Sequence, residues 1–306
     1  VQDRITLFSN VVVFSTYATY VVMSFMMLVM IFMMLPAAQV SAERINEVLE
    51  RDVNIKEGSV SEGREQGTVE FKNVSFRYPH ASEDELSNIS FKIEKGQTLA
   101  IIGATGSGKT TLISLIPRFY DATEGEVLVD GVNVKNYKFD TLYDKLGYVT
   151  QKAVLFAGSI RENVFFGESA APESDEELKN AIELSQAEEF VHMISQMGRN
   201  VSGGQKQRLS IARALSRKPE ILVFDDSFSA LDYKTDAKLR EGLNEKLGDT
   251  TKIIVAQRIS TIRHADKIIV LDRGEAVGMG THEELMKSCD VYKEIALSQL
   301  SAAELA

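Results

Sequence analysis

The chain has 306 residues, of which 44% are hydrophobic and 25% are charged, and its 34 Lys and Arg against 44 Asp and Glu give a formal charge of −10. This length favours about two structural units, and the ordinary composition excludes a disordered tail, a collagen-like fibre and a disulfide scaffold. Because affinity for a phosphate backbone requires clustered cations, we expect no nucleic-acid partner for this acidic chain.

The first predicted element is a transmembrane helix within residues 1–38. No charged residue occurs from Ile5 to Ala42, and Val11–Leu35 is almost entirely apolar. About 20 apolar residues in a helix cross a bilayer core, so the run is long enough to span. A signal peptide, which has a shorter apolar region after a basic one, and a buried core helix are the alternatives. The chain does not begin with Met, and one span is a poor transport pathway, so we expect a piece of a multi-pass membrane protein.

Residues 39–67 are predicted to connect this helix to a second domain. Pro36 predicts a kink or a new helix start just past the apolar run. The apolar residues from Ala42 to Leu49 have helical spacing. The polar, glycine-containing stretch Arg51–Gly67 is typical of a linker.

From residue 68 onwards, short β-rich runs alternate with helical patterns. The predicted strands are Val69–Val74, Ile89–Ile93, Thr98–Ile102, Ile221–Phe224, Lys252–Val255 and Lys267–Leu271. The predicted helices are Thr111–Phe119, Asp175–Ile194, Gly203–Ser216 and Thr235–Leu247. Strands that alternate with helices predict an α/β domain with a largely parallel sheet over residues 68–300.

A phosphate-binding loop follows the strand that ends at Ile102. Its sequence has the pattern G-x-x-x-x-G-K-[ST] between a strand and a helix. Backbone N–H groups of such a loop surround phosphate oxygens, Lys109 can reach the β- and γ-phosphates, and the Thr110 hydroxyl can bind Mg²⁺. The predicted nucleotide-binding residues of this segment are Gly103, Ala104, Thr105, Gly106, Ser107, Gly108, Lys109, Thr110 and Thr111.

Two carboxylates end the buried strand Ile221–Phe224. In an open α/β sheet, ligands gather at the carboxyl ends of the strands. Asp225 is therefore predicted to hold Mg²⁺ through water, and Asp226 stands where a base would orient the attacking water.

The segment Asn200–Arg208 resembles the signature motif of ATP-binding cassette (ABC) proteins, usually written LSGGQ. A serine at a helix start and two glycines expose N–H groups to an anion. The resemblance implies a P-loop NTPase fold with a RecA-like core, a β-subdomain and a helical subdomain over residues 158–218. It also implies that two cassettes dimerise head to tail around two ATP molecules. The residues that would bind the partner's ATP are Ser202, Gly203, Gly204 and Gln205.

Other motifs follow in the order of the ABC family. Tyr78 resembles the aromatic residue that stacks on adenine, and Gln151 resembles the Q-loop glutamine that reaches Mg²⁺ and touches the transmembrane part. The resemblance covers Val69 to Leu297, and the apolar helix is similar to the last membrane helix of exporter-type half-transporters. The D-loop that crosses the dimer interface is matched by Ser229, Ala230, Leu231 and Asp232. The implied cofactors are ATP and Mg²⁺, with the metal held by Thr110, Gln151 and Asp225.

Two residues of the hydrolytic machinery depart from the family pattern. Asp226 stands where Glu is usual, and Gln257 stands where the switch histidine is usual. A misplacement of about 1 Å can lower a rate ~10²-fold, and glutamine can bond a γ-phosphate but cannot titrate near neutral pH. The short segment Ser195–Arg199 also replaces a longer, Glu-bearing loop of the family. Either the protein lacks this loop, or the protein has the loop and the present sequence leaves it out.

The resemblance and the departures together predict an ATP-binding subunit of a bacterial membrane ABC exporter with multidrug or lipid-like cargo. Its own site, with Asp226, Gln257 and Gln151 as catalytic residues, is expected to hydrolyse ATP weakly, while its signature serves a second half-transporter in a heterodimer. The other expected partners are the bilayer of the cell membrane and the transported small molecule. An active homodimer and a regulatory half that acts as an ATP-dependent gate are the alternatives.

The single cysteine, Cys289, excludes an internal disulfide and indicates a cytoplasmic cassette.

Overall fold

The structure is a computed structural model that describes residues 2–168, 171–188 and 193–299. The chain divides into two compact units, which meet at residues 54 and 55.

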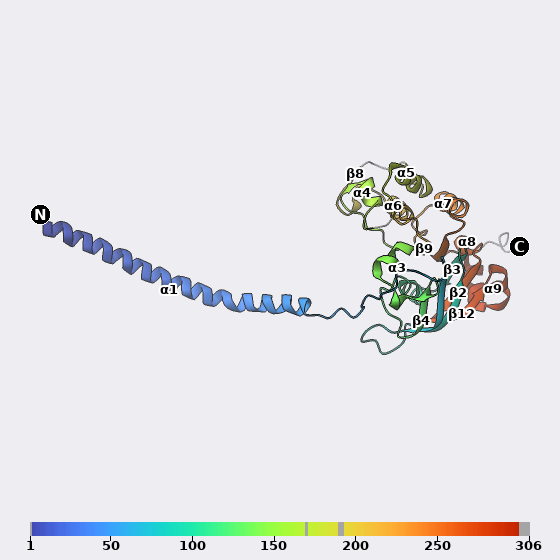
Figure 1. Ribbon diagram of the computed structural model, residues 1–306, viewed down its shortest axis with the longest axis horizontal. Coiled ribbons are helices and arrows are strands. Elements are labelled where there is room, and N and C mark those ends of the chain that lie inside the picture. Colours follow the sequence, from blue (N-terminus) through green and yellow to red (C-terminus); the bar gives the residue numbers. More distant parts are fainter. Residues whose placement is uncertain (1, 169–170, 189–192, 300–306) are drawn as a thin grey trace. The chain divides into compact units, whose positions relative to one another are not determined.

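The first unit is a single helix, α1 (Gln2–Leu49), with 48 residues and no buried side chain (Figure 1). An 18-residue window of α1 has a mean hydropathy of 2.4, and among the described residues α1 is the one helix long and apolar enough to cross a membrane. Thr16 and Ser24 satisfy their hydroxyl groups within the helix, because each donates to the carbonyl four residues earlier at 2.8 Å.

The expected new helix start at Pro36 is wrong, because α1 continues through Pro36 to Leu49. Proline has no N–H donor, so the helix loses one hydrogen bond at Pro36. The helical turns before and after this residue keep theirs.

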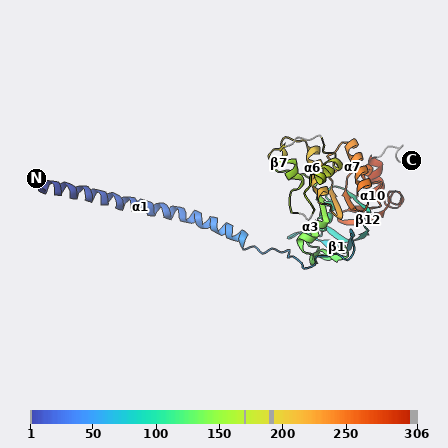
Figure 2. The ribbon, with the colours of Figure 1, turned by 45° about the horizontal axis from the view of Figure 1, so that its top comes forward.

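The second unit contains the remaining elements (Figures 1 and 2). Its strands are β1 (Val69–Phe76), β2 (Leu86–Ile93), β3 (Thr98–Gly103), β4 (Glu124–Val129), β5 (Val132–Asn133), β6 (Leu146–Val149), β7 (Gly158–Ser159), β8 (Met193–Ile194), β9 (Ile221–Asp225), β10 (Thr251–Val255), β11 (Lys267–Asp272) and β12 (Glu275–Gly280). Its α-helices are α2 (Lys109–Ser114), α3 (Phe139–Lys145), α4 (Ile160–Val164), α5 (Asp175–Leu184), α6 (Gly203–Ser216), α7 (Tyr233–Lys246), α8 (Ile259–Ile262), α9 (His282–Ser288) and α10 (Asp290–Gln299). Two 3₁₀ turns occur at Val134–Asn136 and Gln196–Gly198.

A six-stranded sheet with the order β12-β11-β3-β10-β9-β6 forms the centre of the second unit. Only its edge strand β12 is antiparallel among these strands, and the other neighbours pair in parallel. Alternate residues of β10 point into different hydrophobic clusters, with Ile253 and Val255 in one and Ile254 in the other. Both faces of the sheet are therefore covered, which explains the continuous apolar runs of its strands. The expected α/β fold with a largely parallel sheet is confirmed.

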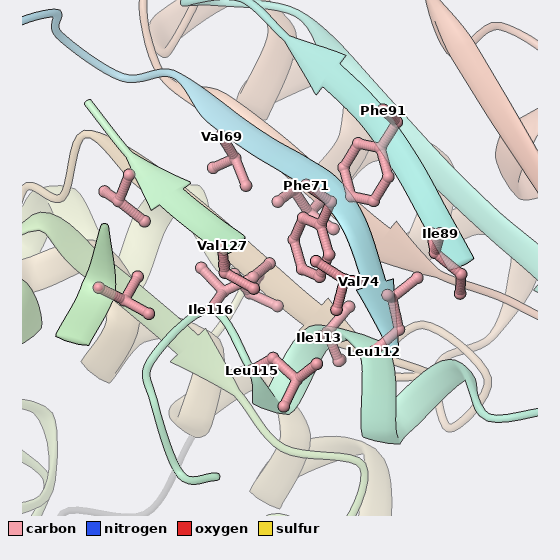
Figure 3. Packing of buried hydrophobic residues seen from close by; sticks show 14 of the residues in the cluster. Val69, Phe71, Val74, Ile89, Phe91, Leu112, Ile113, Leu115, Ile116 and Val127 are labelled. Atoms are coloured by element: carbon pink, nitrogen blue, oxygen red, sulfur yellow. The ribbon is translucent and has the colours of Figure 1, made fainter. Parts of the chain in front are cut away.

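A second, antiparallel sheet with the order β2-β1-β4-β5 packs against α2. Figure 3 shows Phe71 of β1 beside Phe91 of β2, whose rings stack with centroids 4.6 Å apart. The same view shows Leu112 and Ile113 of α2 in this cluster, and both are fully buried. This packing fixes the helix that follows the glycine-rich loop.

Helix α6 contacts both α4 and α5 in a helical region that includes the short β7–β8 pair (Figure 1). Helix α6 begins and ends at the predicted residues. The predicted helix Asp175–Ile194 is wrong in its second half, because α5 ends at Leu184 and Gln186 adopts a left-handed φ of 57°. Met193 and Ile194 form β8 instead, and the part of this prediction over residues 189–192 lies outside the described residues.

The polar stretch expected to be a linker up to Gly67 is attached to the second unit from Ile55 onwards. The Gly58 N–H donates to the Tyr137 carbonyl at 2.9 Å, and the Thr68 N–H donates to the fully buried Asp130 carboxylate at 3.1 Å. Burial raises the pKa of Asp130, although the Lys145 ammonium, 2.7 Å away, acts in the opposite direction. The second unit therefore begins before residue 68.

Candidate active site

The glycine-rich loop connects the end of β3 to the start of α2, in the context that the sequence predicts. Gly106 and Gly108 have left-handed φ values of 80° and 92°. A methyl group on Gly108 would lie 2.7 Å from the Leu86 side chain, whereas one on Gly106 would meet open space. Positive φ values without steric cost are a property of glycine, so the sequence sets this turn locally. Loops of this shape direct consecutive N–H groups toward an anion.

Lys109, the first residue of α2, folds back over the loop. Its ammonium donates to the carbonyls of Gly103 at 2.9 Å and Ala104 at 2.6 Å, and the Ser107 hydroxyl lies 3.4 Å away. Burial lowers the pKa of Lys109, while the carboxylates of Asp226 and Asp225 act in the opposite direction. A phosphate group in the loop would replace these carbonyls as the partner of the ammonium.

Asp225 and Thr110 place two oxygen atoms that can bind a metal ion at the carboxyl end of β9. The Thr110 hydroxyl donates to the Asp225 carboxylate at 2.9 Å. Burial raises the pKa of Asp225, and the neighbouring Asp226 also raises it, although the Thr110 hydrogen bond lowers it. Mg²⁺ is bound through one or two carboxylates plus substrate phosphates, so this donor set fits the cation. A bound Mg²⁺ would neutralise phosphate charge and favour the ionised form of Asp225.

Asp226 receives two side-chain amides on the same carboxylate oxygen. Gln257 Nε2 lies 2.7 Å from Asp226 Oδ2, and Gln151 Nε2 lies 3.4 Å from it. Burial raises the pKa of Asp226, and the hydrogen bonds act in the opposite direction. The residue has a left-handed φ of 46°, and its N–H donates to the Val255 carbonyl at 3.0 Å. Asp is among the few non-glycine residues that adopt this conformation readily.

Tyr78 lies at the edge of the same site and is half-buried. Its hydroxyl is 3.0 Å from the Thr111 hydroxyl, and its ring packs edge-on against Phe76 at 4.8 Å and Tyr120 at 5.3 Å between centroids. The ring is therefore held firmly beside α2, where it can present a face to an adenine base.

The loop, the Asp pair and the two glutamines enclose one cavity of about 200 Å³. Sequence reasoning missed two residues that line it, Glu85 and Val255. Val255 ends a predicted strand and follows from the topology, but Glu85 directly precedes β2 and has no motif that could have indicated it. A larger cavity of about 740 Å³, lined by Phe119, Tyr148 and Arg213 among others, contains no glycine-rich loop.

The signature segment lies outside the residues that line this cavity and begins α6. Ser202 and Gln205 cap the helix reciprocally: the Ser202 hydroxyl accepts from the Gln205 N–H at 3.3 Å, and Gln205 Oε1 accepts from the Ser202 N–H at 2.8 Å. A methyl group on Gly203 would meet nothing within 4 Å, whereas one on Gly204 would lie 3.2 Å from the Ala230 carbonyl.

The D-loop residues connect Asp226 to α7. The Ser229 hydroxyl donates to the Asp226 carbonyl at 2.8 Å, and Leu231 is buried in the core. Asp232 caps α7 by accepting from the Thr235 N–H at 3.0 Å. Ser229 and Ala230 are exposed. The loop residues Gly103–Thr111, Gln151, Asp225, Asp226 and Gln257 therefore gather at one site, and the signature and D-loop form a separate, exposed edge.

Comparisons with known proteins agree with this geometry. Residues 86–229 match the family model described as ABC transporter. An ABC transporter ATP-binding protein of Mycobacterium tuberculosis is 42% identical over 96% of this chain and 52% of its own length. A Staphylococcus aureus protein, named as a candidate multidrug export ATP-binding/permease protein, is 40% identical over 81% of this chain and 44% of its own. The chain thus spans about half the length of the curated relatives it matches.

A solved structure of a bacterial Atm1-family ABC exporter with ATP bound is similar to this chain, with a TM-score of 0.77 and 30% identity. The match covers 89% of this chain and 49% of the exporter chain. Together with the glycine-rich loop and the parallel sheet, these findings identify residues 86–229 as an ABC transporter ATP-binding domain within a chain that has the ABC-cassette fold.

Proposed function

We propose that this chain is the ATP-binding half of a membrane ABC exporter whose own hydrolytic site is degenerate and whose signature serves a different partner subunit. In this proposal α1 spans the cell membrane, the second unit lies in the cytoplasm, and Mg-ATP binds between the glycine-rich loop of this chain and the partner's signature. Multidrug or lipid-like small molecules are the proposed cargo, and the name of the Staphylococcus aureus relative supports the multidrug class.

One observation carries the proposal of a weak hydrolytic site. Gln257 and Gln151 both direct amide nitrogens at Asp226 Oδ2, at 2.7 and 3.4 Å. A carboxylate that activates water must accept a proton, and these donors take up Oδ2, so that only Oδ1 is left for this role. Neither amide can take up the proton in turn at neutral pH. One of the two oxygens of the Asp226 carboxylate is therefore engaged by amide donors before a water molecule can approach it.

The phosphate loop, Thr110 and Asp225 keep the residue types of the family pattern. Lys109, Thr110 and Asp225 supply the charge and the oxygen donors that Mg-ATP needs. The site is thus suited to bind nucleotide for long periods, while Ser202 and the two signature glycines support turnover at the other site of the pair.

ATP hydrolysis in lipid tests the proposal. The full-length protein that contains this chain is assayed alone, together with the half-transporter encoded next to it, and with an unrelated half-transporter as the control. We expect little activity alone and strong activity only with the neighbour. Full activity of the protein alone would mean an active homodimer and would overturn the roles assigned to Asp226 and Gln257.

A further inference from the structure

The C-terminal helix α10 reaches the loop that carries Gln257. Gln299, the last residue of α10, donates from its amide nitrogen to the Gln257 carbonyl at 2.8 Å. Its amide oxygen accepts from the Ile259 N–H at 2.9 Å. One side chain 42 residues away thus bonds the backbone on both sides of Arg258, which lies between the switch position and α8.

The position of Gln299 is determined by the packing of α10. Tyr292 and Ala296 are fully buried, and residues 292, 296 and 299 follow the spacing of one helix face. The Tyr292 hydroxyl lies 2.7 Å from Nδ1 of His282 in α9, so the start of α10 is anchored to the second unit. The same face belongs to the hydrophobic cluster that contains Ile259 and Ile262 of α8. The Gln299 amide therefore extends from a fixed helix.

Among the described residues this loop is also restrained by the fully buried Ile259 side chain and by the Arg258 carbonyl, which accepts from the Thr261 N–H at 3.2 Å. Gln257 is exposed, and among the described residues its side chain bonds only Asp226. Arg258 precedes α8 without a side-chain cap on that helix. The Ile259 N–H is one of the first N–H groups of α8, which have no partner within the helix, and Gln299 Oε1 supplies the missing acceptor.

We infer that Gln299 is a positioning residue, which holds the backbone of residues 257–259 so that the Gln257 amide stays directed at Asp226 and at the nucleotide. This inference rests on the proposed function, because it assumes that Gln257 acts on the γ-phosphate of an ATP molecule bound at this site. It adds that α10 controls the switch position of this cassette from outside the nucleotide cavity.

Hydrogen exchange of the full chain tests the contact itself. Gln299→Met removes both hydrogen bonds, and Gln299→Glu keeps an acceptor for the Ile259 N–H but removes the donor to Gln257. Ser298→Ala is the matched control, because it changes an exposed neighbour whose hydroxyl donates to the Ile295 carbonyl of the same helix. We expect Gln299→Met to speed exchange at Ile259 about five- to tenfold, the factor for one ordinary hydrogen bond, while Gln299→Glu and Ser298→Ala leave it slow. Unchanged exchange in Gln299→Met would overturn the inference.

Nucleotide affinity then separates positioning from a purely structural role. We expect Gln299→Met to lower the preference for ATP over ADP about three- to tenfold, because apparent affinity scales with the fraction of loops in the competent conformation. A structural defect would weaken both nucleotides equally and would overturn the inference. Gln257→Ala is measured in parallel. If it leaves the ATP preference intact, the proposed role of Gln257 fails, whereas the exchange data still decide whether Gln299 holds the loop.

Discussion

Replacing Asp226 by Glu and Gln257 by His together should raise hydrolysis at this chain's own site. The added methylene moves the carboxylate outward by about 1.5 Å. In the present structure this space is occupied, because Gln257 Nε2 already lies 2.7 Å from Asp226 Oδ2. Asp226→Glu alone would therefore press against the amide, and Gln257→His alone would leave the carboxylate short. We expect the double variant to gain up to about 10²-fold, the factor associated with a 1 Å correction.

Because the two side chains touch, the double variant should exceed the product of the single variants. Phosphate release is measured at saturating Mg-ATP in the assembled pair, with the partner's catalytic carboxylate removed so that only this site turns over. The control is Asp226→Gln with Gln257→His, which has the same length but no base. Equal rates in the control and the test variant, or no gain in either, would refute the reasoning.

Asp226→Glu also has a cost in the fold. Asp226 has a φ of 46°, a conformation that costs most residues other than Gly, Asn and Asp roughly 1–2 kcal/mol. The variant should therefore unfold about 2–4 °C lower than the wild type if the cost is near 1 kcal/mol. Its hydrolysis is accordingly compared well below both unfolding temperatures.

Three further outcomes are expected. Lys109→Ala should weaken ATP binding about 10–10²-fold in titration calorimetry, because a charge-assisted bond to phosphate is lost; equal affinity would contradict the assignment of the loop. Ser202→Ala should destabilise α6 by about 1 kcal/mol through loss of the cap. It should also slow ATP hydrolysis by the assembled pair more than Asp226→Asn does. The opposite ranking of rates would exclude asymmetric sites. Burial raises the pKa of Asp225, so its ionised form destabilises the nucleotide-free fold above that pKa. Asp225→Asn should therefore raise the unfolding temperature at pH 7, and the gain should vanish as the pH falls through the raised pKa, whereas a gain that is constant with pH would contradict this cause.

Sequence patterns predicted the elements whose signals are local. Strands β3, β9, β10 and β11 are within one residue of the predicted ranges, because buried parallel strands are continuous apolar runs. Helix α6 matches fully, since Ser202 and Gln205 mark its start in the sequence itself. The glycine-rich loop also follows from local spacing.

Features that depend on tertiary contacts could not be read from the sequence. Helix α5 ends where Gln186 turns left-handed, and no residue type announces that turn. Attachment of the segment from Ile55 onwards depends on a residue far away in the chain, because the Arg64 and Glu65 N–H groups donate to the Asp130 carbonyl. The convergence of Gln151 and Gln257 on one oxygen of Asp226, and the contact of Gln299 with the loop, likewise join segments more than 30 residues apart.

The two adjacent glycines of the signature differ in what surrounds them. A methyl group on Gly204 would press on the Ala230 carbonyl, whereas one on Gly203 would have no atom of the described residues within 4 Å. Replacement of Gly203 by alanine should therefore leave the folding of the isolated chain unchanged. If that replacement silences transport, the obstruction must come from a molecule that closes over the signature, and a mutational scan at this single position becomes a gauge of how tightly that second surface fits.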